Sequence, residues 1–360
     1  MRIVIAGEGD GQARELTQAL EDLGLDWDVG SVAPGGSSFA AIDGEVDVIV
    51  SPLRVGAASG AELLAQVRAS HPQAVRIVLL DKGQEGQAIH ALDSAHRMLN
   101  TPLDASELIE AVDSVIDLRG LLTSDELKQT IGRIGSLPPP PRVYIELTQL
   151  MRDPDASNAE IAEVLAQDPA IAAKVLRLCN SAYFSGGRVI TDMRAAVTRL
   201  GMQALRNMVL ASETFGSIQS ANSVDRDAMQ ERALRTSRLA ARLLGGSSAE
   251  LASTAGLLAE VGRLVPGVRE RDGEPGPHHA EAGAYLLGLW GLPMPIVEAV
   301  AYHRTPSRMK SSGFWVSGAV HVASSLVSGE ELDMDYLRAV GVSDKVPQWR
   351  ALAESMAEAA

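Results

Sequence analysis

Residues 1–118 alternate short apolar runs with segments of helical periodicity, and this alternation constrains the fold more than any other feature. One apolar run, residues 46–50, stops at Ser51-Pro52, and a helical pattern follows from residue 61. A short apolar run that ends at a turn and leads into a helix is typical of a buried parallel strand and its crossover. Its repetition predicts an α/β region with a doubly wound parallel sheet covered on both faces.

The carboxyl end of the strand at residues 46–52 lacks the side chain that chemistry at such a sheet needs. Open parallel sheets place ligands and reacting groups at the carboxyl ends of their strands. The segment resembles the phosphoacceptor strand of response-regulator receiver domains, and the resemblance aligns Pro52 with the aspartate that accepts the phosphoryl group. Because proline has no carboxylate, the resemblance implies a flavodoxin-like domain without its usual reaction.

The other receiver positions are altered as well. Gly7-Glu8 stands where receivers carry an acidic pair for magnesium, and one carboxylate is too little to hold a hard cation. Asp81 replaces the Ser or Thr that senses the phosphate, and Thr101, before Pro102, replaces the lysine. The resemblance also implies a cis bond before Pro102. We expect a pseudo-receiver; the alternative is a different flavodoxin-like domain that never used phosphate.

Composition restricts the partners. The formal net charge of −14 would repel nucleic acid and anionic lipid at long range. No apolar run approaches the roughly 20 residues of a membrane helix, and the N-terminus leads directly into a strand without signal-peptide features. The single cysteine, Cys179, lies in an amphipathic pattern that predicts a core thiol. We expect a cytoplasmic protein that binds neither membranes nor nucleic acid.

The strand pattern stops after residue 118, and helical periods dominate the rest of the chain. We therefore expect an all-α second domain. The predicted organisation is a degenerate receiver domain at 1–118, a helical linker and proline-rich entry at 119–141, and a helical domain with a C-terminal helical tail at 142–360.

Three helix starts are predicted from local signals. Ser157 with Glu160, and Ser247 with Glu250, each form the pattern of a capping box. Asp168 is expected to cap a helix whose first residue is a proline.

Several blocks between about residues 125 and 330 resemble the HDOD family, the HD-related output domain. The more specific blocks are residues 180–184 (NSAYF) and 289–293 (LWGLP), and the weaker ones bear glycines at 256, 262 and 283. By analogy with the family, the resemblance implies a bacterial signalling protein that acts through protein–protein interaction. The partner is not identified by the sequence, and residues 106–116 of the receiver are expected to offer a docking or homodimer face.

HDOD domains are similar to HD-type metal phosphohydrolases, which hold their metals through histidines and aspartates. Of the matching positions only Glu260 could ligate a metal, and a lone carboxylate would not retain a divalent cation. We therefore expect no metal, no cofactor and no catalysis, with a basic partner for Glu260 instead. The matching positions are Thr236, Ala259, Glu260 and Ser324, and the nearest basic residues are Arg235, Arg238 and Arg263.

The histidines of the helical domain offer another reading. His278, His279, His303 and His321 could form a new site, but histidines at the ends of amphipathic patterns are more often hydrogen-bonded structural residues. His279 and His303 are kept as candidate pocket residues.

Two functional alternatives stay open. One is a metal-dependent phosphohydrolase of the HD superfamily. The other is a DNA-binding regulator, because residues 195–210 place Gly201 between two helical patterns that carry Arg194, Arg199, Arg206 and Asn207. The acidic charge and the apolar spacing of the same segment oppose the DNA-binding alternative.

Overall fold

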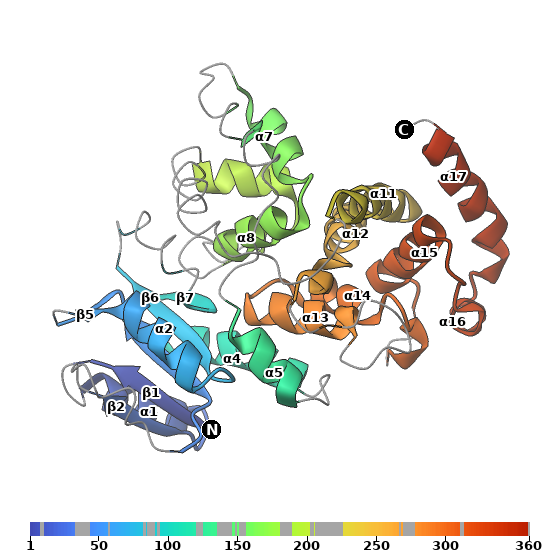
Figure 1. Cartoon of the computed structure of the whole chain (residues 1–360). Coiled ribbons are helices and arrows are strands. Elements are labelled where there is room, and N and C mark those ends of the chain that lie inside the picture. The colour runs from blue at the N-terminus through green and yellow to red at the C-terminus, as the bar shows by residue number, and fades with distance from the viewer. Residues whose placement is uncertain are drawn as a thin grey trace.

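The computed structural model describes residues 1–7, 11–32, 44–56, 58–81, 84, 91, 94–119, 125–134, 146–147, 150, 156–180, 189–201, 205, 226–265, 268, 278–309 and 313–358. Figure 1 shows a sheet with its helices, built by the N-terminal part, beside a helical region built by the rest. Among the described residues, no helix is both long and apolar enough to cross a membrane.

Five strands form a parallel sheet in the order β2-β1-β3-β6-β7. They are β1 (Arg2–Ala6), β2 (Asp28–Val32), β3 (Val48–Pro52), β6 (Val75–Leu80) and β7 (Arg97–Asn100). All of β6 and all of β3 except Pro52 are buried, because these strands lie between helical layers and are apolar on both faces. The predicted doubly wound parallel sheet is confirmed.

Three helices pack with this sheet. The first, α1 (Gly11–Asp22), contacts β2 and α4 (Ala105–Arg119), whereas α2 (Gly60–Ser70) contacts β3 and β6. A short antiparallel pair, β4 (Arg54–Val55) and β5 (Ala58–Ser59), lies between β3 and α2. The peptide bond between Thr101 and Pro102 is cis, as predicted.

The described residues after α4 form helices, which confirms the all-α prediction for this region. The elements are α5 (Asp125–Gly132), α7 (Asn158–Leu165), α8 (Pro169–Cys179), α11 (Arg226–Leu243), α12 (Ser247–Leu258), η1 (Val261–Leu264), α13 (His279–Leu289), α14 (Met294–Tyr302), η2 (Pro306–Arg308), α15 (Val316–Ser328), α16 (Met334–Ala339), η3 (Ser343–Lys345) and α17 (Val346–Glu358). The domain boundary near residue 118 and the proline-rich entry stay predictions, since residues 120–124 and 135–145 lie outside the described part.

Two of the predicted helix starts are right. Ser157 and Glu160 form a complete capping box at α7, and the Asp168 side chain accepts a hydrogen bond from the Ile171 N–H, at 2.8 Å, at the start of α8. The box predicted at Ser247 is wrong. The cap of α12 is Gly246, at φ 59°, which makes Ser247 the first helical residue and moves Glu250 one position too far along to reach back.

A glycine allows η1 to lie directly against α13. A Cβ on Gly262 would lie 1.9 Å from the carbonyl oxygen of His279 and 2.6 Å from the backbone nitrogen of Gly283. Any larger residue would push the two backbones apart. The glycine at position 262, a weak signal in the sequence, is therefore required by packing.

The sheet region and the helical region meet along α13, which contacts α4 and α5 (Figure 1). Arg97, at the start of β7, donates from Nη2 to the carbonyl oxygen of Gly288 at 2.7 Å. This carbonyl is near the C-terminus of α13, where a cation also complements the helix dipole. In the opposite direction, Arg177 of α8 donates to the carbonyl of Ala95. Each region thus reaches main-chain carbonyls of the other.

Candidate functional site

The receiver-like positions lie at the carboxyl edge of the sheet, because the strands that carry them are parallel. Gly7 follows β1, Pro52 ends β3, Asp81 follows β6, and Thr101 follows β7. Glu8 lies outside the described residues. Asp81 and Thr101 are both exposed, and Asp81 accepts a hydrogen bond from Gln84 Nε2 at 3.2 Å.

Pro52, which the sequence resemblance aligns with the phosphoryl acceptor, is half-buried. Its carbonyl oxygen accepts a hydrogen bond from Ser51 Oγ at 3.0 Å. A Cβ on Gly60, the first residue of α2, would lie only 1.8 Å from the same oxygen. The start of α2 therefore closes directly over the end of β3. The Pro52 side chain offers no nucleophile and no metal ligand here.

The positions matched to the metal ligands of HD enzymes lie on three elements of the helical region. Thr236 is buried on α11, Ala259 and Glu260 follow α12, and Ser324 is buried on α15. The helices α11, α12 and α15 pack against one another pairwise. Ser324 Oγ donates to the carbonyl of His321 at 3.3 Å, so its hydroxyl is used within its own helix.

Glu260 is held by two arginines. Arg232 donates to Oε2 from Nε at 3.1 Å and from Nη2 at 2.9 Å, and Arg263 Nε lies 3.4 Å from Oε1. Of the basic partners proposed from the sequence, Arg263 is right. No hydrogen bond or ion pair joins Glu260 to Arg235 or Arg238 within the described residues, and Arg232 was missed. The missed signal is helical spacing: Arg232 lies four residues before Thr236 and so shares its face of α11.

This donor set does not fit a divalent metal. Thr236, Ala259 and Ser324 supply two hydroxyls and a methyl group, and the single carboxylate is already paired with two guanidinium groups. Structural and catalytic metals need several carboxylate, imidazole or thiolate ligands. Across the part of the chain that the structure describes, no three His, Cys, Asp or Glu side chains are grouped to hold an ion.

Four histidines lie close together where α13, α14 and α15 meet, and three of them are buried while His278 is half-buried. The rings of His278 and His279 stack with centroids 4.4 Å apart, and the His279 and His303 centroids are 5.4 Å apart. His303 Nδ1 lies 2.8 Å from the carbonyl of Val300, and His321 Nδ1 lies 2.7 Å from the carbonyl of His303. Since a carbonyl can only accept, both Nδ1 atoms carry the proton.

Burial lowers the pKa of the three buried histidines, His279, His303 and His321. It lowers the pKa of His303 to about 3, and it lowers the pKa of His279 well below its ordinary value, with nearby His303 and Arg263 adding to the effect. His321 Nε2 accepts from the backbone N–H of Asp333 at 2.9 Å, which requires an unprotonated nitrogen. These hydrogen bonds fit the interpretation of His303 and His321 as structural residues, and those of His321 connect the end of α14 to the start of α16.

The residues behind the DNA-binding alternative belong partly to the core. Val197, Leu200 and Leu205 are buried, and Arg194 pairs with Glu163 at 3.5 Å. Arg206 and Asn207 lie outside the described residues, as do residues 181–184 of the predicted NSAYF block. Cys179 is buried, and burial raises the pKa of its thiol to about 12, as expected of a core thiol.

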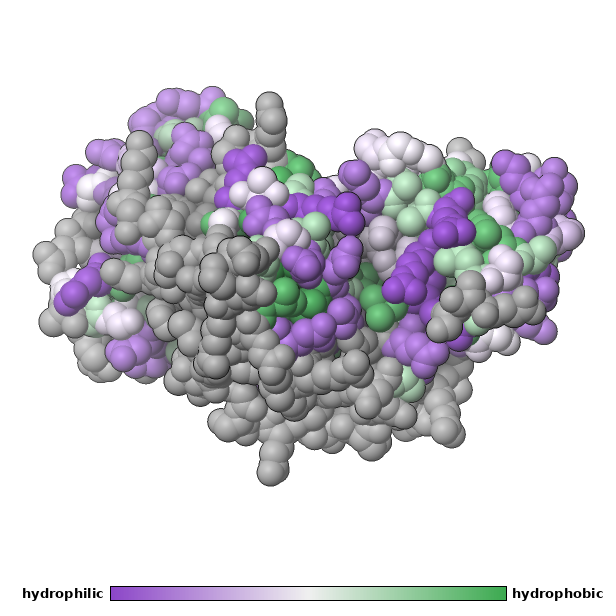
Figure 2. Space-filling view, turned by 90° about the horizontal axis from the view of Figure 1, so that it is seen from above, coloured by the Kyte–Doolittle hydropathy of each residue, from purple (hydrophilic) through white to green (hydrophobic). Residues whose placement is uncertain are grey.

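The face of the molecule seen in Figure 2 carries no single broad apolar area among its described residues. Figure 2 shows hydrophilic and hydrophobic residues interleaved over the coloured surface. The large exposed hydrophobic side chains are scattered over the chain: Leu23, Val189, Trp315 and Met334. The predicted docking helix at 106–116 is part of α4, which contacts α13 within the same chain.

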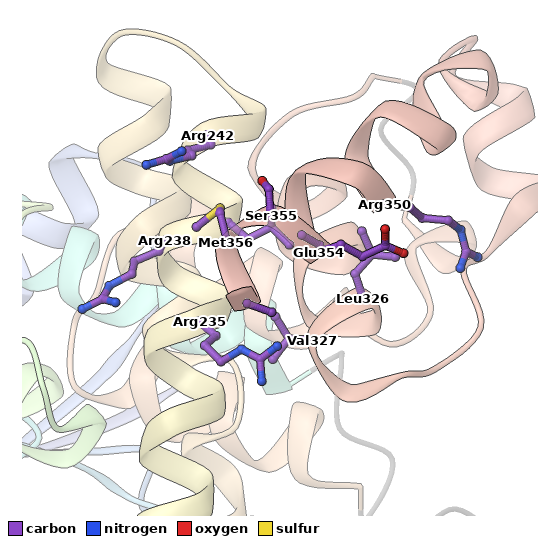
Figure 3. Close-up of a pocket in the computed structure, with 12 residues that line it drawn as sticks. Arg235, Arg238, Arg242, Leu326, Val327, Arg350, Glu354, Ser355 and Met356 are labelled. Atoms are coloured by element: carbon purple, nitrogen blue, oxygen red, sulfur yellow. The ribbon is translucent and has the colours of Figure 1, made fainter. Parts of the chain in front are cut away.

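A further surface feature was not foreseen from the sequence: a groove between α11 and α17 lined by arginines (Figure 3). Its signal in the sequence is the spacing of Arg235, Arg238 and Arg242, which places all three on one face of a helix.

Comparison with known proteins identifies the helical region. The family model for the HDOD domain matches residues 137–272. An uncharacterised protein of Treponema pallidum (strain Nichols) is 28% identical over 197 residues, 48% of this chain, and the match spans only 38% of that relative's length. The structure of the MmoQ response regulator from Methylococcus capsulatus str. Bath is 21% identical and covers 60% of this chain and 98% of its own, with a TM-score of 0.48. A virulence factor from Campylobacter jejuni subsp. jejuni is 16% identical and covers 64% of this chain and 93% of its own, with a TM-score of 0.46.

Proposed function

Residues 137–272 form an HDOD domain, and from this premise we propose that the chain is a bacterial signalling protein that acts by binding other proteins, without catalysis. One observation carries the proposal. Thr236, Ala259, Glu260 and Ser324 are the HD-like positions, matched to the metal ligands of HD enzymes, and their one carboxylate, Glu260, forms ion pairs with Arg232 and Arg263. A carboxylate shared by two guanidinium groups is a poor metal ligand, because the metal would have to displace both cations.

The sheet domain supports the same reading of the protein as a non-enzymatic signalling component. A phosphoryl group transferred in the usual way needs an acceptor carboxylate, and the strand end offers Pro52 instead. We therefore assign the sheet domain a role as a pseudo-receiver whose contribution to signalling does not depend on phosphorylation at that position. A homodimer through this domain stays a prediction, and it would need a face other than the part of α4 that contacts α13.

Partner recognition would use a composite surface. The reciprocal contacts of Arg97 with Gly288 and of Arg177 with Ala95 tie the two regions together. A partner that binds where the two regions meet would therefore contact both of them. A structural change in one region would then alter the contacts that the partner makes with the other.

The test is metal analysis and turnover on the full-length protein purified without chelator. We expect less than about 0.1 equivalent of divalent metal and no hydrolysis of bis(p-nitrophenyl) phosphate in Mn²⁺ above the buffer rate. Stoichiometric metal together with hydrolysis that is lost in Glu260→Gln would overturn the proposal and establish the phosphohydrolase alternative.

Partner binding is tested in parallel with immobilised full-length protein and extracts of its own cells. We expect the immobilised chain to capture a specific protein, and we expect this capture to persist after the extract is treated with nuclease. Capture that depends on added DNA, with a steep salt dependence, would favour the DNA-binding alternative.

A further inference from the structure

A groove lies between α11 and α17, with α15 at its base (Figure 3). Its lining includes neither Glu260 nor the residues at the carboxyl edge of the sheet. Its volume is about 420 Å³, which is within the range of small-molecule sites. About half of the lining is apolar, and its apolar residues are Leu239, Leu326, Val327, Ala353, Met356 and Ala357. Its charged lining consists of four arginines and one acid: Arg235, Arg238, Arg242, Arg350 and Glu354.

Three of these arginines lie on one face of α11. Arg235, Arg238 and Arg242 are separated by three and four residues, so their side chains are neighbours along the helix. Like charges at this spacing destabilise a helix unless anions compensate them. Among the described residues, no carboxylate forms an ion pair with Arg238 or Arg242, both of which are exposed, and Arg235 reaches Glu231 only at 3.9 Å.

The orientation of the side chains separates this row into two parts. In Figure 3, Arg238 and Arg242 extend to the same side of α11, whereas Arg235 extends toward Val327. Met356, near the end of α17, lies beside α11 between the two parts. Arg238 and Arg242 therefore present their guanidinium groups on one side of α11, away from Arg235 and Val327, although all four residues line the groove.

We propose that this groove binds a phosphate-bearing ligand with a flat apolar body, the chemistry of a nucleotide. Two neighbouring guanidinium groups match the oxygens of a phosphate, because each presents planar, paired N–H donors. The apolar base, with the adaptable thioether of Met356, accommodates the non-polar part. In a chain with a net charge of −14, such a concentration of arginines also selects an anion locally against the overall repulsion.

The groove is distinct from the HD-like positions, although both use α11. Arg232 donates to Glu260, and the groove begins about one turn further along α11, at Arg235. Binding here would therefore report to the HDOD domain through α11 and α15 without any reaction at Glu260. The inference does not depend on the proposed signalling role.

The test is isothermal titration of the full-length protein with ATP and GTP, with adenosine and inorganic pyrophosphate as probes of the two halves. EDTA is present throughout, so that no metal bridges the phosphates. We expect at least one nucleotide to bind with a Kd below 1 mM, and adenosine and pyrophosphate to bind at least tenfold more weakly. The double variant Arg238→Ala/Arg242→Ala should weaken nucleotide binding at least tenfold, whereas Arg14→Ala, an exposed arginine on α1, should leave it unchanged.

Three results would overturn the assignment. If neither nucleotide binds, the proposed class of ligand is wrong. If a nucleotide binds and the double variant does not weaken its binding, the proposed site is wrong. Pyrophosphate binding as tightly as the nucleotides would show that the apolar base contributes nothing. Circular dichroism and thermal unfolding of the double variant establish that it is folded, which is expected because both arginines are exposed.

Discussion

The carboxyl edge of the sheet and the HD-like positions of the helical domain both differ from their relatives' reactive sites, but in opposite ways. At the sheet edge, Pro52 stands at the position predicted for an acceptor carboxylate, and Asp81 and Thr101 at the same edge are exposed to water. In the helical domain a carboxylate is kept, at Glu260, whose side chain is only 12% exposed and is neutralised by two arginines. An exposed site can lose its partners freely because water solvates what remains, whereas a buried charge must be paired.

The largest expected effect concerns the buried histidines of the helical domain. The folded pKa of His303, about 3, is below its ordinary value of 6.5 because of burial, so the unfolded chain takes up the proton first as the pH falls. Its contribution to stability is thus complete above pH 6.5 and is lost as the pH falls from there toward 3. The loss approaches about 1.4 kcal/mol per pH unit for one proton.

Urea unfolding between pH 7 and pH 4.5 measures this slope. His303→Asn keeps a donor near the Val300 carbonyl but cannot titrate, so its slope should be smaller than that of the wild type. Identical slopes would contradict a neutral His303.

The next effect tests the pairing of the buried carboxylate. Glu260→Ala should lower the free energy of unfolding by about 2 kcal/mol, because Arg232 and Arg263 would lose their shared acceptor. The value is set below that for a fully buried pair because the Arg232 side chain is 34% exposed.

The comparison is sharpened by two matched substitutions followed by urea unfolding. Glu354→Ala, at an exposed carboxylate on α17, should change the free energy by less than about 0.5 kcal/mol. Pro52→Ala, at the sheet edge, should cost less than about 1 kcal/mol. If Glu260→Ala lowers the free energy of unfolding no more than these two substitutions do, the buried ion pairs of Glu260 do not distinguish the helical site from the sheet edge.

A smaller effect is expected at the seam between the two regions. Arg97→Ala removes the donor to Gly288 at the C-terminal end of α13 and should cost about 1 kcal/mol. Faster amide hydrogen exchange at the end of α13, measured by mass spectrometry, would locate the effect. Arg54→Ala, an exposed arginine on β4, should alter neither quantity.

No effect at all is expected from a phosphoryl donor. Acetyl phosphate with Mg²⁺ should leave the intact mass of the protein unchanged, because Pro52 offers no acceptor oxygen in its side chain. A stoichiometric adduct of one phosphoryl group on a peptide from residues 1–118 would refute the pseudo-receiver assignment. A receiver domain with its acceptor aspartate serves as the positive control.

Local patterns in the sequence were sufficient for much of the fold. The apolar runs at β3 and β6 predicted a sheet buried on both faces, and Ser157 with Glu160 predicted a capped helix start. The same kind of reasoning failed at Ser247, where Gly246 caps α12 instead. Both residues are compatible with a helix start, and the choice between them depends on where the preceding helix delivers the chain.

Periodicity is a local property of a chain, so the sequence was sufficient to predict the parallel sheet and the helical region that follows it. Helix packing, in contrast, was needed to show which arginines hold Glu260 and which carbonyl Arg97 contacts. It was also needed to show that arginines of α11 border a groove. Those pairings depend on how α11 is rotated against α12 and α17 and on how α13 meets the sheet. These rotations are set by packing contacts between residues far apart in the chain. Patterns among neighbouring residues in the sequence therefore do not predict them.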